Sequence, residues 1–317
     1  MKRILVATVV CVVLALAAFA LAARSRALNP SEAELRAKYM LATSKMIEID
    51  GAPIHYADEG QGEVIVLVHG TFGSLRMWEP WVTALKDRYR IVRFDRPPYG
   101  LSGPDPKDRY GLEREVAIIE GLVAKLGLEK FYLGATSSGG MSVTPYAAKH
   151  PEQIKGLVLA NIAVKPAPID PNRNTWFVRQ SRKVAAMLNG WHPKAEWVDV
   201  LKRNIVAHEK VTDALVTEYT ELNNRPASYL ASQAPRPPAP RTVEDLGKIT
   251  APTLILWSED DSERPPHPDT DDAMAALAAE DKTVVIIPRC EHMMPLDCGP
   301  ESAAAAKAFF DRVSAGK

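Results

Sequence analysis

The chain has 317 residues, of which 46% are hydrophobic, with 39 basic and 39 acidic side chains. This length predicts one large domain with a sizeable core, or a domain that carries an insertion. A formal net charge of zero gives no reason to expect nucleic-acid binding, and three cysteines exclude a disulfide scaffold. No cysteine or histidine cluster suggests a zinc site, so we expect neither a metal nor a cofactor.

The first thirty residues form a separate segment. Two basic residues precede an uncharged apolar run over residues 4–23, and two arginines follow it closely. Twenty such residues can span a bilayer, and the run is longer than a usual signal-peptide core. Ala20-Leu21-Ala22 nevertheless resembles a cleavage site, so a signal peptide stays open. We favour an uncleaved anchor over residues 1–30, with the globular part outside the cytoplasm or, if cleavage occurs, secreted or periplasmic.

The first part of the predicted core, residues 31–164, alternates strands with helices. Ser31 and Glu34 form a capping-box pattern that begins a short helix. We expect a hairpin over 46–58, strands over 63–68, 89–95, 131–136 and 154–164, and helices over 74–88 and 112–126. Alternation of this kind predicts an α/β fold whose sheet has eight mostly parallel strands, with helices on both faces.

The alternation stops after residue 164. Residues 165–249 indicate helices and loops without a convincing strand, and a proline-rich stretch at 234–241 is interpreted as a stiff return connection. The second part of the core, 250–317, then carries strands over 252–257 and 283–288, and helices near 271–279 and 301–313. We therefore predict a helical cap, residues 165–249, inserted between two strands of the sheet.

The stretch FYLGATSSGGM, residues 131–141, carries the strongest chemical signal. An apolar strand changes abruptly to serine and glycine before a helix, which is the pattern of a nucleophile elbow, G-x-S-x-G. Small residues are needed there because the backbones of strand and helix nearly touch. Ser137 is the centre, with Ala135 in the first glycine position. Registers centred on Thr136 or Ser138 fit the small positions less well, and an ordinary glycine-rich turn is the alternative.

A serine nucleophile needs a neighbouring base, which is itself oriented by a carboxylate. After an elbow of this kind, the chain order is serine, then aspartate or glutamate, then histidine. Among the seven histidines, only His292 follows the last predicted strand and precedes the closing helix. The acid is expected in the acidic loop over residues 258–262, after the strand at 252–257.

From about residue 44 to 315 the chain resembles the cap-bearing α/β-hydrolase superfamily of esterases, lactonases, C–C bond hydrolases, epoxide hydrolases and haloalkane dehalogenases. The resemblance is carried, in chain order, by LVHGTFG, FDRPPYGLSG, ATSSGG, LILWSEDD and PRCEHMMPLDCGPE. Motifs that are weak singly are strong jointly when their order is right. The family's strand-loop pattern selects Asp261 as the acid, with Asp260 as the runner-up. An acid position used by other relatives falls near Asn161, which cannot serve as a carboxylate.

The resemblance also implies the role of each residue. His292 would be the general base that takes the proton of Ser137, and Asp261 would hold the imidazole tautomer. Backbone N–H groups of Ser138 and Thr71 would bind the oxyanion, with Phe72 as the alternative donor. The substrate pocket would lie between the cap and the carboxyl ends of the strands. Its expected lining is apolar: Phe72, Met141, Trp176, Phe177 and Met293.

A serine at the elbow narrows the chemistry, because the family's dehalogenases and epoxide hydrolases use an aspartate there. We predict hydrolysis of small to medium apolar esters or lactones through an acyl-enzyme. A C–C bond hydrolase is the first alternative, although Met293 and Met294 stand where those enzymes usually have an aromatic residue after the histidine. A non-catalytic ligand-binding protein with the same fold is the second. The sequence indicates no oligomeric state.

Cys290 and Cys298 flank the histidine loop. The two could pair if the domain is exported, but eight residues of separation are not diagnostic, and we favour free, packed thiols. Cys11 lies inside the apolar run, where an inert thiol is expected.

Overall fold

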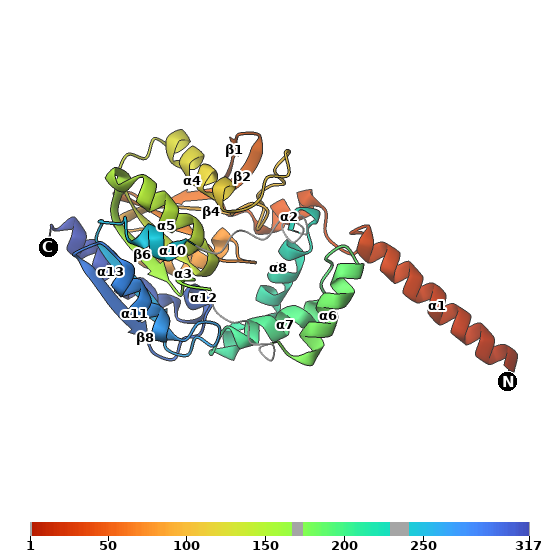
Figure 1. Cartoon of the computed structure of the whole chain (residues 1–317). Coiled ribbons are helices and arrows are strands. Elements are labelled where there is room, and N and C mark those ends of the chain that lie inside the picture. The colour runs from red at the N-terminus through yellow and green to blue at the C-terminus, as the bar shows by residue number, and fades with distance from the viewer. Residues whose placement is uncertain (1, 167–173, 229–240, 317) are drawn as a thin grey trace.

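A single eight-stranded sheet forms the centre of the molecule. The computed structural model describes residues 2–166, 174–228 and 241–316 (Figure 1). The strands lie in the order β1-β2-β4-β3-β5-β6-β7-β8. β2 is antiparallel to both of its neighbours, and the other pairs are parallel, as predicted. The strands are β1 (Ser44–Ile49), β2 (Ala52–Glu59), β3 (Glu63–Val68), β4 (Tyr89–Phe94), β5 (Phe131–Thr136), β6 (Ile154–Ala160), β7 (Thr253–Ser258) and β8 (Lys282–Ile287).

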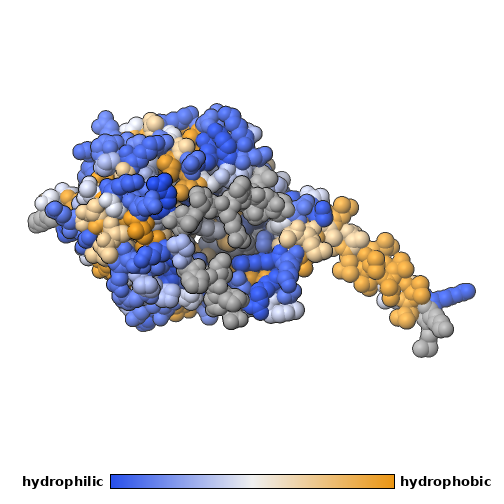
Figure 2. All heavy atoms as spheres, viewed as in Figure 1, coloured by the Kyte–Doolittle hydropathy of each residue, from blue (hydrophilic) through white to orange (hydrophobic). Residues whose placement is uncertain are grey.

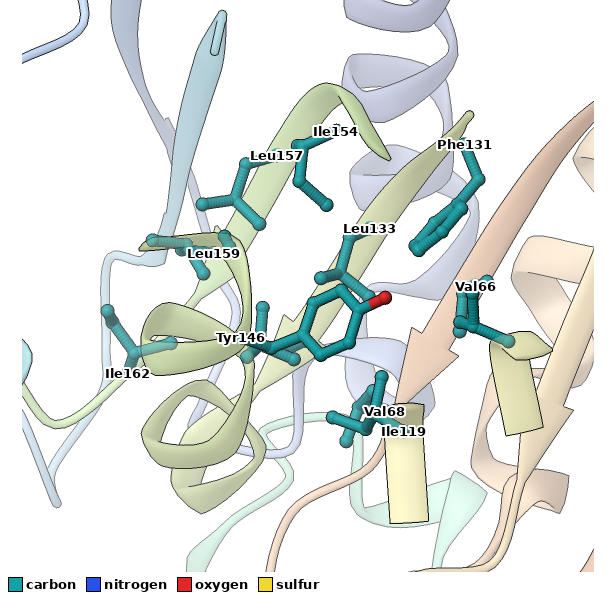
Figure 3. Close-up of a cluster of buried hydrophobic side chains, with 14 of the residues drawn as sticks. Val66, Val68, Ile119, Phe131, Leu133, Tyr146, Ile154, Leu157, Leu159 and Ile162 are labelled. Atoms are coloured by element: carbon teal, nitrogen blue, oxygen red, sulfur yellow. The ribbon is translucent and has the colours of Figure 1, made fainter. Parts of the chain in front are cut away.

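Both faces of the sheet are covered by helices. α4 (Leu112–Leu126), α5 (Gly140–Lys149) and α11 (Pro266–Ala276) contribute to the core of one face, and α3 (Glu79–Leu85) and α13 (Gly299–Ser314) to that of the other. Both faces of strand β5 are buried, which explains why its sequence is largely apolar. Phe131 and Leu133 point into the first core (Figure 3), whereas Tyr132 packs in the second, because successive side chains of a strand alternate between faces.

Two predicted elements are shorter in the structure than the sequence indicated. The expected helix over 74–88 is divided into a 3₁₀ turn, Leu75–Trp78, and α3, whose first turn contains Pro80, a residue favoured where a helix begins. The strand expected over 154–164 ends at Ala160, because Asn161 has a left-handed φ of 48°. The side chain of Asn161 bonds the backbone N–H and the hydroxyl of Ser258 at the end of β7.

The N-terminal segment forms one long helix, α1 (Lys2–Arg24), whose apolar side chains are exposed over most of its length, whereas Ala23 near its end is buried. Figure 2 shows it as an apolar rod that projects from a largely hydrophilic body. Residues 3–24 are long and apolar enough to cross a membrane. The predicted capping box is present at the start of α2 (Glu32–Tyr39), where Ser31 and Glu34 bond each other's backbone N–H groups.

Residues 165–249, here called the inserted segment, lie between β6 and β7. Within its described residues, 165–166, 174–228 and 241–249, there is no strand, as expected. Its elements are α6 (Trp176–Met187), α7 (Lys194–Arg203), a 3₁₀ turn (His208–Lys210), α8 (Asp213–Asn223) and α10 (Thr242–Leu246). Leu246 of α10 belongs to the core beside α5 and α11. The proline-rich stretch at 234–240 lies outside the described residues.

Cys290 and Cys298 form a disulfide, so the preference for free thiols was wrong. Their Cα atoms are 5.7 Å apart, within the usual range for a bridge. The short helix α12 (Met294–Asp297) reverses the chain between them, and Asp297 accepts the backbone N–H of Glu291. The separation of the two cysteines by eight residues in sequence does not reveal that the chain reverses between them.

Candidate active site

Ser137 occupies a strained turn between β5 and α5. Its φ is 52°, a left-handed value that non-glycine residues rarely adopt. A Cβ atom at Gly139 would lie 2.8 Å from the carbonyl oxygens of Val68 and His69, so only glycine fits there. A Cβ at Gly70 would lie 2.9 Å from the Cβ of Ser137. These close approaches agree with the register centred on Ser137 and explain why the neighbouring positions are small.

Ser137, His292 and Asp261 form one hydrogen-bonded chain of side chains. His292 Nε2 lies 2.9 Å from Ser137 Oγ, and His292 Nδ1 lies 2.7 Å from Asp261 Oδ2. The other carboxylate oxygen of Asp261 accepts the backbone N–H groups of Glu263 and Arg264, at 2.8 and 2.7 Å. These bonds fix the carboxylate and leave Oδ2 for the imidazole. The structure thus brings together the three residues predicted from sequence.

Asp260, the runner-up for the acid, lies on the surface. Its side chain is exposed, whereas Asp261 is only 2% exposed. The backbone N–H of Asp260 donates to the carbonyl of Cys290, on the loop that carries the histidine. Of these two adjacent aspartates, Asp261 is therefore the buried partner of His292, and Asp260 is a solvated carboxylate.

The loop that carries His292 is anchored on both sides. Asn161 donates to the carbonyl of His292 at 3.1 Å, and Glu291 accepts the backbone N–H of His292 at 2.7 Å. Burial raises the pKa of Glu291, and the nearby negative charge of Asp261 raises it further. The backbone N–H of Met293 donates to Asn204 of the inserted segment. The backbone of the loop that carries His292 is thus held by contacts with both the end of β6 and the inserted segment.

Sequence reasoning missed Arg96, which connects the two predicted oxyanion loops. Its guanidinium donates to the carbonyl of His69 at 2.8 Å and to the hydroxyl of Ser138 at 3.0 Å, and it is held by both oxygens of Glu115. Ser138 in turn lies 2.8 Å from the hydroxyl of Thr71. The FDRPPYG motif was a signal for this residue, but its contacts depend on tertiary structure.

His69 is a structural histidine of fixed tautomer. Its Nε2 accepts the backbone N–H of Arg96 at 2.8 Å, so its Nδ1, 2.7 Å from the carbonyl of Gly70, carries the proton. Burial, with a contribution from the charge of Arg96, lowers the pKa of His69 from 6.5 to about 4.

We expect this burial to make stability depend on pH. Between pH 6.5 and about 4 the unfolded chain protonates at this position and the folded chain does not. Stability therefore rises with pH through this window, and up to ~3 kcal/mol is lost as the pH falls through it. Denaturant unfolding across pH 4–8 should show this slope, and the slope should be smaller in His69→Gln. An equal slope in both proteins would contradict the assignment.

A cavity of about 330 Å³ opens beside Ser137. The candidate oxyanion donors Thr71, Phe72 and Ser138 line it, as do the predicted pocket residues Met141 and Met293. Phe72 has a left-handed φ of 62°, which marks a sharp turn at this point. The cavity wall also includes His292, Asn174, Val200, Asn204, Ala163, Glu263 and three arginines.

Two predicted lining residues do not reach this cavity. Trp176 and Phe177 are 69% and 42% exposed and lie on the outer side of α6. The reason is the phase of the helix, which turns Val178 and Ala185 inward. The cavity is also more polar than predicted, since Arg182, Arg203 and Arg264 line it. Among the residues that the structure describes, no group of His, Cys, Asp and Glu side chains could hold a metal ion.

The sheet order and the turn at Ser137 together belong to a known class of fold. A family described as the alpha/beta hydrolase fold matches residues 63–297, and the chain belongs to this family. The cis-3-alkyl-4-alkyloxetan-2-one decarboxylase of Shewanella oneidensis is 29% identical over 67% of this chain and 71% of its own. A 2-hydroxy-6-oxononadienedioate/2-hydroxy-6-oxononatrienedioate hydrolase of Paraburkholderia xenovorans is 29% identical over 69% of this chain and 80% of its own.

Among solved structures, that of a membrane phospholipase A, a bacterial virulence factor, matches with a TM-score of 0.71. It is 24% identical, and the match covers 99% of both chains. At this identity the likeness shows the shared fold. The chain is therefore an α/β hydrolase-fold enzyme with one apolar N-terminal helix.

Proposed function

We propose that this protein is a serine hydrolase that cleaves carboxylic esters or lactones through an acyl-enzyme. The observation that carries the proposal is the hydrogen-bonded chain from Ser137 through His292 to Asp261, at the wall of a cavity. A buried carboxylate, an oriented imidazole and a hydroxyl within its reach are the parts that acyl transfer requires. The same three groups give a non-catalytic binding protein no evident advantage.

The proposed reaction begins with His292. Its Nδ1–H donates to Asp261, which leaves the lone pair of Nε2 to take the proton of Ser137 Oγ as this oxygen attacks the acyl carbon. Backbone N–H groups of Ser138 and Thr71 would bind the resulting oxyanion. The imidazolium then gives its proton to the leaving alkoxide, and water hydrolyses the acyl-enzyme by the reverse proton path.

A C–C bond hydrolase remains the second candidate, because one relative at 29% identity carries that activity. The relative named for an oxetan-2-one, which is a four-membered lactone, favours a substrate with an oxygen ester bond instead. Arg182, Arg203 and Arg264 line the cavity wall, and each also pairs with an acidic side chain of the protein. Their remaining N–H donors support an ester that also carries an acidic or polar group.

A substrate panel distinguishes these functions. We expect a fluorophosphonate probe to label Ser137, and the protein to turn over p-nitrophenyl esters or lactones faster than a vinylogous 1,5-diketone. Faster cleavage of the diketone would favour the C–C hydrolase. A protein that neither reacts with the probe nor turns over any member of the panel would be a binding protein.

We further propose that α1 is an uncleaved anchor. Cleavage after Ala22 would remove the contact of Phe19 with Trp191, whose ring centroids are 5.4 Å apart. It would also make Ala23, whose side chain is fully buried, the new charged N-terminus. The disulfide between Cys290 and Cys298 supports a location outside the cytoplasm, where such bonds persist.

A further inference from the structure

Helix α6 has an apolar side that no part of the described chain covers. Val178 and Ala185 are buried against the inserted segment, yet four other apolar side chains of the helix are exposed. These are Trp176 (69%), Phe177 (42%), Val184 (51%) and Met187 (70%). At 3.6 residues per turn, these four positions fall within about a third of the helix circumference. We call them the outer face of α6.

The outer face lies beside the end of α1. Arg24 of α1 donates to the carbonyl of Met187, and Asn189 donates back to the carbonyl of Arg24. Arg26 bonds the carbonyl of Asn189, and Phe19 packs edge-on against Trp191. Figure 1 shows that one end of α6 lies near the C-terminal end of α1 and that the two helices point in clearly different directions. A helix in this position lies near the plane of any membrane that α1 crosses.

Basic side chains border the outer face. Arg179 and Lys183 are exposed on α6 next to this face, and the helix has no acidic residue. Helices that lie in a membrane interface have this pattern, with tryptophan and aliphatic residues on one side and lysine or arginine on the other. Tryptophan is enriched at the level of the lipid headgroups.

We propose that the outer face of α6 lies in the interface of the same bilayer that α1 crosses, against anionic phospholipids. A lipid surface fits better than a protein partner because the outer face adjoins the end of the anchor, where Arg24 donates to the backbone carbonyl of Met187. The flanking positive charge is complementary to anionic headgroups. The proposal rests on the proposed role of α1 as an anchor.

The position of α6 connects this surface with the candidate active site. Arg182, on another side of the helix, lines the cavity that contains Ser137 and His292. One helix thus has an apolar side toward the lipid and a basic side toward the cavity. Esters with an acidic headgroup would reach Ser137 from the bilayer rather than from bulk water.

Site-specific fluorescence in vesicles tests the contact. In a Cys11→Ser background, the full chain carries an environment-sensitive fluorophore at Val184→Cys or Met187→Cys and is reconstituted in phosphatidylethanolamine–phosphatidylglycerol vesicles. Val13→Cys reports insertion of α1, and Lys130→Cys, exposed beside β5, reports the distant end of the sheet. We expect brominated lipids to quench the probes at 13, 184 and 187 but not the probe at 130.

The pattern of quenching separates the two proposals. Quenching at 13 without quenching at 184 and 187 would overturn the docking of α6 and leave the anchor intact. Absence of quenching at 13 would overturn the anchor and the docking together. Shielding of 184 and 187 by a second copy, seen as crosslinking between copies without lipid quenching, would also overturn the proposal.

A functional measurement covers the case in which a probe disturbs folding. Val184→Glu with Met187→Glu should lower turnover of a vesicle-embedded ester about tenfold or more, because burying a carboxylate in the interface is unfavourable. Turnover of soluble p-nitrophenyl butyrate should stay within about twofold, since neither residue lines the cavity. Ala124→Glu, exposed near the end of α4 that leads into β5, is the control for an added surface carboxylate and should affect neither substrate. Equal losses on both substrates would contradict the proposal.

Discussion

Ser137→Ala should reduce ester turnover roughly 10,000-fold or more, because no other group can form the acyl-enzyme. The cavity and the His292–Asp261 pair should persist, so substrate binding should change far less than kcat. Steady-state kinetics on p-nitrophenyl esters measure the loss, and circular dichroism confirms that the fold is intact.

Ser138→Ala is the matched control for this variant. Its hydroxyl lies in the same cavity and bonds Arg96, but its proposed catalytic group is the backbone N–H, which the substitution retains. We expect a loss of less than about tenfold, from the weakened loop contact. A Ser137→Ala protein with undiminished turnover, or a Ser138→Ala protein that is equally inactive, would contradict the assignment of the nucleophile.

Asp261→Asn should lower kcat roughly 1,000- to 10,000-fold without unfolding the protein. The backbone N–H groups of Glu263 and Arg264 would hold the amide oxygen where one carboxylate oxygen now lies. The amide NH₂ would then face Nδ1 of His292 and force the proton onto Nε2. In that tautomer the imidazole cannot accept the proton of Ser137.

Asp260→Asn makes the same chemical change one residue earlier and serves as the control. Its side chain is exposed, so we expect activity within about twofold of the unmodified protein. The comparison is made by kcat on one ester at constant pH. A large loss in Asp260→Asn with little effect in Asp261→Asn would move the acid to the runner-up position.

Much of the fold could be predicted because both faces of the sheet are buried. Strands such as Phe131–Thr136 must then be apolar throughout, and their alternation with amphipathic helices is visible in the chain. Predicted boundaries were less accurate. The end of β6 at Ala160 depends on the backbone of Asn161 and its bonds to Ser258, which join positions far apart in sequence.

The candidate site was predictable to the extent that its chemistry requires rare local patterns. A serine in a turn of small residues, an acidic loop and a histidine before the last helix have recognisable neighbours in sequence. Phe72, Met141 and Met293 adjoin these motifs and do line the cavity, but the lining from the inserted segment has no such signal. Trp176 and Phe177 were placed there because they are apolar, but the phase of α6 turns them outward and brings Arg182 to the cavity.

By itself the sequence predicted the strands and helices in chain order, the apolar N-terminal helix, and Ser137 and His292 as candidate site residues, since each depends on local patterns and on position in the chain. The choice of Asp261 over Asp260 came from the resemblance to the α/β-hydrolase superfamily. Only the tertiary structure decided which atoms meet. The disulfide of Cys290 with Cys298, the contacts of Arg96 and the outward face of α6 depend on how separate elements pack. The side on which each residue packs depends on contacts between segments that are distant in sequence, so it cannot be predicted from the local sequence pattern.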